Sequence, residues 1–254
     1  PKMANKTLAF EIGTEELPAF DLHNATVKLG GLLEDALHDA RISFDAVEVF
    51  TTPRRLIVIA TGLPEATEES VEEFRGPSAK IAFDADGNPT KAATGFARGK
   101  GVDPADLERR DENGTEYVWA VKRIPAQATA ELLPGILGNL ITSVPWPKTQ
   151  RWGSRHEQFS RPVRWLLALL DNEVVPVEFA GLVSGRLTRG HRFLAPGPHE
   201  VASADKLIEV LRAASVVPSE AEREASIRKQ VAEIEAKTGL VADLPAKKIG
   251  RAHV

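Results

Sequence analysis

The chain has 254 residues and a formal net charge of −4 at pH 7, with 43% hydrophobic and 27% charged residues. These values are typical of a soluble globular protein with one large or two modest domains, and they exclude a uniformly basic nucleic-acid coat. Because there is no membrane-length apolar run, no signal-peptide core and no cysteine for disulfides or thiolate metal sites, we expect a cytoplasmic protein without a membrane partner.

Residues 4–64 are predicted to form a strand–helix–strand unit. The stretch 7–13 alternates apolar and polar residues, which is typical of a half-buried strand. Apolar residues at helical spacing then run from 18 to about 41. The stretch 47–60 returns as a strand that is interrupted at Thr52-Pro53, and its continuous apolar end indicates burial on both faces.

An acidic linker over 65–73 precedes an α+β body predicted over 74–200. Within this body, residues 91–100 are predicted to form a short helix, and Asn113-Gly114 is a tight-turn signal for a hairpin. Helical spacing returns over 129–144.

The body ends in a predicted hairpin. Apolar runs over 163–170 and 174–180 flank the turn Asp171-Asn172. After the body, residues 201–243 are predicted to be a helical segment, and 244–254 are expected to be a non-native tail. The order of elements predicts an α+β fold of mixed sheets with packed helices.

The stretch 148–193, which contains the hairpin, is strongly basic. It holds eight Lys or Arg residues against four acids, so it is +4 locally while the whole chain is −4. Seven of the eight are Arg, whose planar guanidinium suits phosphate and stacks on rings. The cations form two clusters, 148–164 and 186–192, which meet if the middle folds as a hairpin.

This pattern indicates a phosphate-facing surface, although a solvated charged face is the alternative interpretation. The candidates for phosphate contact are Arg151, Arg161, Arg164, Arg186, Arg189, His191 and Arg192. The candidates for stacking on a base are Trp152 and Trp165.

Elsewhere the sequence shows no self-contained active site. GFARGKG (95–101) lacks the spacing of a phosphate-binding P-loop, and the six histidines lack metal-ligand spacing. Glu11, Glu15 and Glu16 are either an acid/base group or charges at the start of a helix. We therefore assign no catalytic residue and no metal ligand.

Eight short stretches, in order, give the chain a family resemblance. They are FEIGTEELP (10–18), TPRRL (52–56), RGPS (75–78), KAATGFARGKG (91–101), ELLP (131–134), RWG (151–153), FSRPVRW (159–165) and RGHRF (189–193). With this set, the chain resembles the N-terminal third of the beta subunit of bacterial tetrameric glycyl-tRNA synthetase. It departs from that pattern at Gln150, where the family commonly has Met.

The resemblance implies an α2β2 ligase in which the alpha subunit forms glycyl-adenylate and the beta subunit is needed to charge tRNA-Gly. It implies no catalytic residue and no cofactor in this chain, since the assembled enzyme uses the ATP. It also implies a body similar to the B3/B4 region of the phenylalanine enzyme's beta subunit.

Three roles for the chain remain open under this resemblance. The first is a module that contacts tRNA and the alpha subunit. The second is a structural scaffold for the alpha subunit and the rest of beta, without direct tRNA contact. The third is an editing activity that rests on Glu15, Glu16 and the B3/B4 similarity.

Overall fold

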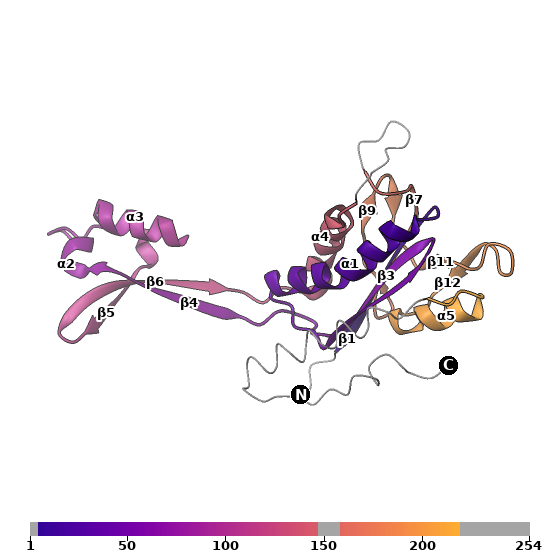
Figure 1. Cartoon of the computed structure of the whole chain (residues 1–254). Coiled ribbons are helices and arrows are strands. Elements are labelled where there is room, and N and C mark those ends of the chain that lie inside the picture. Colours follow the sequence, from indigo (N-terminus) through magenta and orange to yellow (C-terminus); the bar gives the residue numbers. More distant parts are fainter. Residues whose placement is uncertain (1–4, 147–157, 219–254) are drawn as a thin grey trace, which may run out of the picture. The chain divides into compact units, whose positions relative to one another are not determined.

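The structure, a computed structural model, describes residues 5–146 and 158–218 (Figure 1). Residues 68–127 form one compact unit, called unit 2 below, and the described residues on either side of it form unit 1. Antiparallel sheets with helices packed on them confirm the predicted α+β fold. No helix within these described ranges is long and apolar enough to cross a membrane.

A five-stranded antiparallel sheet with the order β2-β3-β1-β7-β8 is the centre of unit 1. Its strands are β1 (Lys6–Thr14), β2 (Ala46–Thr52), β3 (Arg55–Leu63), β7 (Val163–Leu170) and β8 (Glu173–Val174). The single interrupted strand predicted over 47–60 is therefore a hairpin of two paired strands. Pro53 cannot donate a hydrogen bond to a sheet, so β2 ends before it and the chain turns back.

Both faces of this sheet are covered, as Figure 1 shows. Helices α1 (Ala19–Asp39) and α4 (Thr129–Ser143) pack on one face. The 3₁₀ turn η2 (Ala204–Lys206) and helix α5 (Leu207–Ala213) pack on the other. The prediction that one face of β1 is exposed to solvent is therefore wrong. On the face opposite α1, Ala9 packs with η2 and α5, and Glu11 is buried among Arg55, Trp165 and Thr188.

The predicted hairpin at Asp171-Asn172 is present, but its second arm is short. β8 pairs with β7 over two residues only, and the chain then forms small two-stranded ladders. These are β9 (Glu178–Phe179) with β10 (Leu182–Val183), and β11 (Leu187–Arg189) with β12 (Pro198–Glu200). A bridge between Leu167 and Gly185 brings the chain back to β7, so Arg189 lies over Trp165 near the start of that strand.

Unit 2 is a three-stranded antiparallel sheet with the order β4-β6-β5 and a helical layer. Its elements are β4 (Ser70–Ser78), α2 (Ala79–Ala82), α3 (Lys91–Lys100), η1 (Pro104–Asp106), β5 (Glu108–Glu112) and β6 (Thr115–Ile124). The predicted helix over 91–100 and the hairpin at Asn113-Gly114 are confirmed, with φ angles of 53° and 84° at the two turn residues.

The chain divides at places other than those expected from its sequence. The expected body over 74–200 spans both units, because β7 pairs with β1 and the backbone N–H of Thr129 donates to the Glu65 carbonyl. Part of the expected linker belongs to strand β4, which begins at Ser70. In the helical segment 201–243, α5 is present. The rest of that segment after residue 218 and the tail 244–254 lie outside the described residues.

Candidate functional site

A fully buried carboxylate, Glu11 on β1, joins four strands at one end of the unit 1 sheet. It pairs with Arg55 of β3, whose guanidinium NH1 lies 3.3 Å from Glu11 Oε2. The indole N–H of Trp165 on β7 and the hydroxyl of Thr188 on β11 both donate to Glu11 Oε1, each at 2.6 Å. All these groups are buried and hydrogen-bonded, so Glu11 acts as a fixed acceptor that holds the strand ends together.

Several arginine side chains lie close to the indole ring of Trp165. Its ring lies directly over Gly13, its neighbour on β1, where an added Cβ would be 1.9 Å from the ring. The guanidinium carbons of Arg54, Arg55 and Arg189 lie 5.8, 5.3 and 5.7 Å from the ring centroid. These are cation–π distances, so the ring helps to hold three like charges close together.

Five arginines lie around this ring or beside the acidic turn after β1, and we call them the arginine cluster. They are Arg54, Arg55, Arg164, Arg189 and Arg192. Arg164 pairs with Glu15 at 2.7 Å, and Arg192 lies 4.0 Å from Glu16. With the three carboxylates Glu11, Glu15 and Glu16 subtracted, the cluster keeps a positive balance.

Arg54 is a partly buried cation of the cluster with like charges beside it. Burial lowers the pKa of Arg54 from its ordinary value, and the neighbouring Arg192 and Arg55 charges lower the pKa further. Its Nε is buried without a hydrogen-bond partner in the described part of the chain. An anion next to Arg54 would therefore both relieve repulsion and use an unsatisfied donor.

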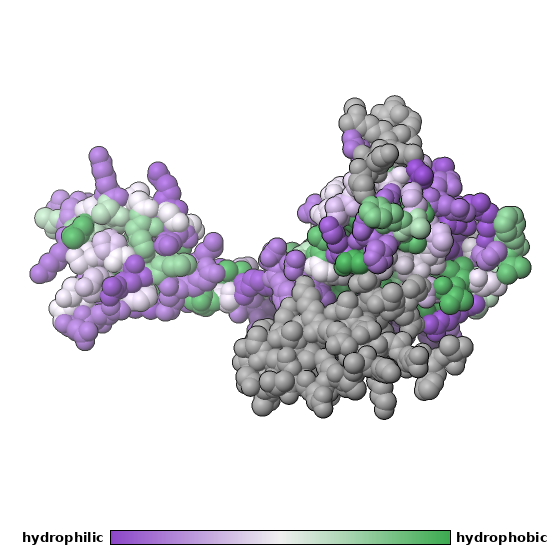
Figure 2. Space-filling view, in the orientation of Figure 1, coloured by the Kyte–Doolittle hydropathy of each residue, from purple (hydrophilic) through white to green (hydrophobic). Residues whose placement is uncertain are grey.

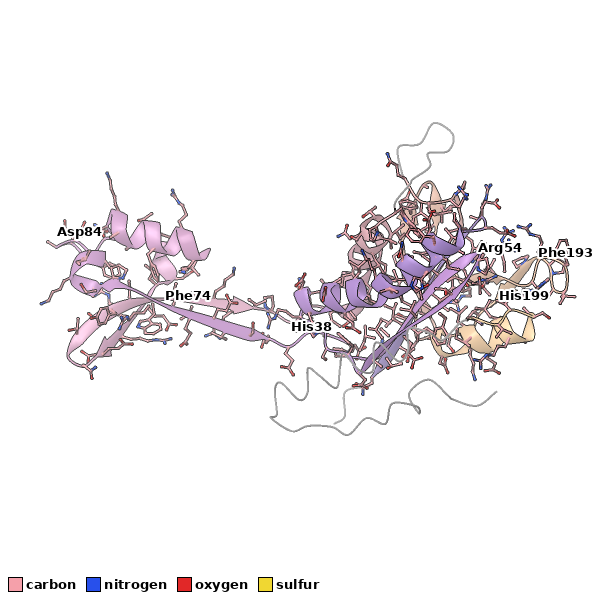
Figure 3. All side chains as sticks on the ribbon, in the orientation of Figure 1. His38, Arg54, Phe74, Asp84, Phe193 and His199 are labelled. Carbon is pink, nitrogen blue, oxygen red and sulfur yellow. The ribbon has the colours of Figure 1, made fainter. Side chains whose placement is uncertain are left out.

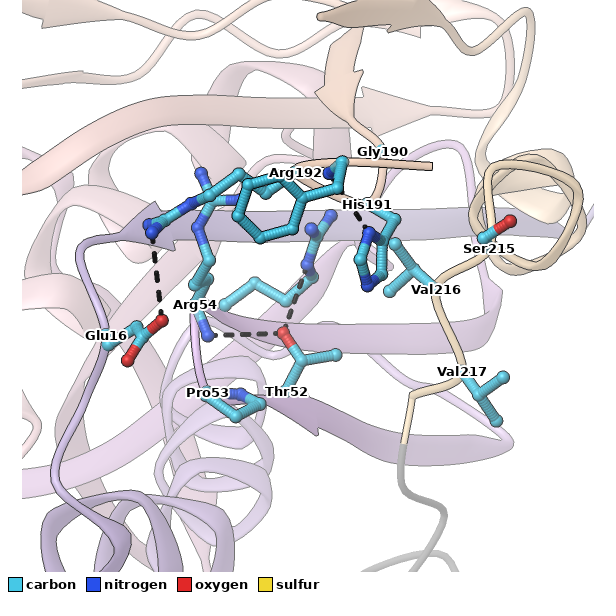
Figure 4. Close-up of a pocket in the computed structure, with 12 residues that line it drawn as sticks. Glu16, Thr52, Pro53, Arg54, Gly190, His191, Arg192, Ser215, Val216 and Val217 are labelled. Carbon is cyan, nitrogen blue, oxygen red and sulfur yellow. Dashed lines mark hydrogen bonds and ion pairs between the residues drawn. The ribbon is translucent and has the colours of Figure 1, made fainter. Parts of the chain in front are cut away.

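A pocket of about 330 Å³ opens beside the arginine cluster (Figure 4). Its walls come from the turn between β2 and β3, the loop after β11 and the segment 215–217 that follows α5. The lining residues are Glu16, Thr52, Pro53, Arg54, Arg55, Gly190, His191, Arg192, Phe193, Ser215, Val216 and Val217. The pocket therefore combines cationic groups with an apolar wall.

Comparisons with known proteins identify the family of this chain. The family model of the glycyl-tRNA synthetase beta subunit matches residues 8–250. A glycine–tRNA ligase beta subunit from Moorella thermoacetica is 43% identical over 234 residues, which is 92% of this chain and 34% of that protein. Those from Syntrophotalea carbinolica and Natranaerobius thermophilus are 41% and 39% identical, over 91% and 95% of this chain.

The chain belongs to the glycyl-tRNA synthetase beta subunit family. It spans about a third of the length of these curated relatives, 34% to 35%. The resemblance predicted from the short sequence stretches is thereby confirmed.

Four of those stretches meet at the candidate site of this glycyl-tRNA synthetase beta family chain. TPRRL contains the turn between β2 and β3, FSRPVRW leads into β7, and RGHRF forms the end of β11 and the loop that follows. FEIGTEELP adds Glu11 and the acidic turn beside them. Segments far apart in the sequence thus build one surface.

The predicted site residues separate into two groups. Arg164, Arg189, His191 and Arg192 lie at this end of the sheet, in the arginine cluster or the pocket. Arg186 lies elsewhere, where its guanidinium donates to the carbonyls of Ala202 and Asn172. Arg161 is half-buried just before β7, and Arg151 and Trp152 lie outside the described residues.

The position of Trp165 does not support its predicted stacking role. Its side chain is 8% exposed, covered by arginines and hydrogen-bonded to Glu11. The ring therefore stabilises the protein's own cations, with no open face for a base.

Arg54, Arg55 and Phe193 are site residues that the sequence prediction missed. Arg54 and Arg55 stand in TPRRL, and the β2–β3 hairpin carries them to the start of β7. Pro53 followed by two arginines is a usable signal, because Pro marks the turn that presents the cations. Phe193 directly follows the predicted Arg192, and its exposed ring is what distinguishes it.

Proposed function

We propose that this chain is a body region of a glycine–tRNA ligase beta subunit that supports ATP-dependent attachment of glycine to tRNA-Gly. In this proposal the adenylate chemistry belongs to an alpha subunit in an α2β2 assembly, and the arginine cluster contacts tRNA phosphates. The observation that carries it is the position of Arg54 and Arg189 over the Trp165 ring, with the Arg192 charge close to Arg54, on strands that the buried Glu11 network holds fixed.

Fixed arginines suit this task because a phosphate accepts the planar guanidinium fork in a defined geometry. Arg189 and Arg192 are exposed, while Arg55 is 2% exposed and donates to the Arg189 carbonyl at 2.7 Å. The inner arginine thus positions the backbone that presents the outer ones. Family membership supports tRNA as the source of the phosphates.

The second candidate function is a structural scaffold whose partner is the alpha subunit or the rest of beta. The ion pairs of Arg164 with Glu15 and of Arg192 with Glu16 favour this role, because paired charges are less available to RNA. Both pairs are partly exposed, so each contributes little to stability and phosphate competes readily for the arginine.

The two candidates are distinguished by tRNA-Gly binding to the assembled complex of alpha and beta. The double variant Arg189→Gln/Arg192→Gln is expected to bind about tenfold more weakly, since each charge-assisted hydrogen bond contributes on the order of 1.5–3 kcal/mol before screening. Lys206→Gln removes an exposed cation of unit 1 that lies outside the cluster and is the matched control.

The result that favours the scaffold is an unchanged tRNA affinity of the double variant. In that case the chain should still co-purify with the alpha subunit while retaining no tRNA by itself.

A further inference from the structure

One side of the pocket beside the arginine cluster carries hydrogen-bond donors, and one of them has no partner among the residues that the structure describes. Arg54 Nε is buried without a partner in the described residues. His191 Nδ1 accepts from the backbone N–H groups of Phe193 and Leu194, each at 3.1 Å, as the dashed contact in Figure 4 illustrates for this ring. In neutral His191 the proton is therefore on Nε2, which becomes a donor. Arg192 completes this polar side.

The other side of the pocket is apolar and open to solvent. Phe193 is 81% exposed and Val217 is 80% exposed, although both are large hydrophobic residues. Figure 2 shows apolar side chains at the end of unit 1 where Figure 3 labels Phe193, and Arg54 lies on the same side. Exposed apolar side chains grouped at a pocket and bordered by polar residues are typical of an interaction site.

The volume of the pocket and the chemistry of its lining together limit the class of ligand that it can bind. A volume of about 330 Å³ is at the lower end of pockets for small ligands, about 300–1,000 Å³, so it admits a single nucleotide and not a duplex. The polar side suits a phosphate and the phenyl ring suits the face of a base. An acidic peptide would pair with the cations but would leave the phenyl ring of Phe193 uncovered.

We propose that this pocket binds one unpaired nucleotide of an RNA strand, with its phosphate against Arg54 and Arg192 and its base against Phe193. The inference rests on the proposed tRNA contact and deepens it, because it assigns a single-stranded nucleotide where the arginine cluster alone requires only phosphates.

The test measures binding of the whole chain to a uridine hexanucleotide and to a blunt RNA duplex with the same number of phosphates. Phe193→Leu is expected to weaken hexanucleotide binding about fivefold or more, the loss that removal of one base–aromatic stack produces, and to leave duplex binding unchanged. Leu194→Ala is the control, because Leu194 is 72% exposed in the same loop and does not line the pocket. A 5-bromouridine in the hexanucleotide should cross-link to Phe193.

Four outcomes overturn the proposal. Equal hexanucleotide binding by Phe193→Leu and the unaltered chain, with Arg189→Gln/Arg192→Gln still weakening both RNAs, removes the pocket assignment and leaves the phosphate surface standing. Absence of binding to either RNA contradicts both the pocket assignment and the proposed phosphate surface. Displacement of the hexanucleotide by micromolar ATP reassigns the pocket to a free nucleotide. Binding of a glutamate hexapeptide with the same loss in Phe193→Leu reassigns it to a protein partner.

Discussion

At the scale of single residues, the site depends on one buried ion pair. Glu11 and Arg55 are 0% and 2% exposed, and each has further hydrogen bonds that satisfy it. A buried pair of this kind adds little net stability, yet removal of one partner leaves an uncompensated charge. Its role here is to fix the geometry of the outer arginines.

Glu11→Gln is expected to lower the free energy of unfolding by about 3–5 kcal/mol, because Arg55 stays buried without its counter-charge. Urea unfolding of the chain measures this. Glu15→Gln, which removes a partly exposed partner of Arg164, is the control and should change stability by under about 1 kcal/mol. Similar midpoints for the two variants would contradict a buried ion pair.

Gly13 gives a second residue-scale prediction. Gly13→Ala places a methyl group inside the Trp165 ring, and Glu11 holds that ring by a hydrogen bond, so we expect a loss of about 1–3 kcal/mol or more. Gly95→Ala on α3 has nothing within 4 Å and should instead stabilise by about 0.5–1 kcal/mol. Thermal unfolding compares them; a neutral Gly13→Ala would show that the ring is not fixed.

At the scale of elements, the pairing of β1 with β3 and β7 assembles the site. The acidic linker region leads from unit 1 into unit 2, which is a separate compact unit. Ala66 and Ala128 form an isolated antiparallel bridge, so the chain leaves unit 1 and returns to it at one point. Nothing in the pairing of the unit 1 sheet uses residues 68–127.

Removal of residues 68–127, with Thr67 joined to Ala128 by Asn-Gly, is therefore expected to leave unit 1 folded. The three-residue loop that results is a common hairpin connection with Gly at its end. Circular dichroism during urea unfolding should show one cooperative transition. Loss of cooperativity in the shortened chain, with the intact chain still cooperative, would contradict the independence of unit 1.

Local sequence patterns predicted the positions of single helices and strands better than they predicted which elements pack together. Strand β7 has the predicted bounds, and helices α1 and α3 lie within the residues where helices were predicted. Burial of the second face of β1 was missed because alternation reports one covered face, while α5, which covers the other, is distant in sequence. Arg54 and Arg55 were missed for the same reason: only the register of β3 beside β1 and β7 brings TPRRL to the predicted arginines.

At the scale of the whole molecule, charge is distributed unevenly. The chain carries −4 overall, yet five arginines gather at one end of the unit 1 sheet. A negative chain with a local cationic surface repels RNA generally while attracting it at one place. This distribution supports the proposed contact between the arginine cluster and tRNA phosphates.

The salt dependence of tRNA-Gly affinity in the assembled complex tests this account most directly. Arg189→Gln/Arg192→Gln should lower the slope of log K against log salt by about 1.4–1.8, since each lost phosphate contact removes about 0.7–0.9 of counterion release. Lys206→Gln should keep the original slope. An unchanged slope for the double arginine variant would show that the arginine cluster does not contact tRNA phosphates.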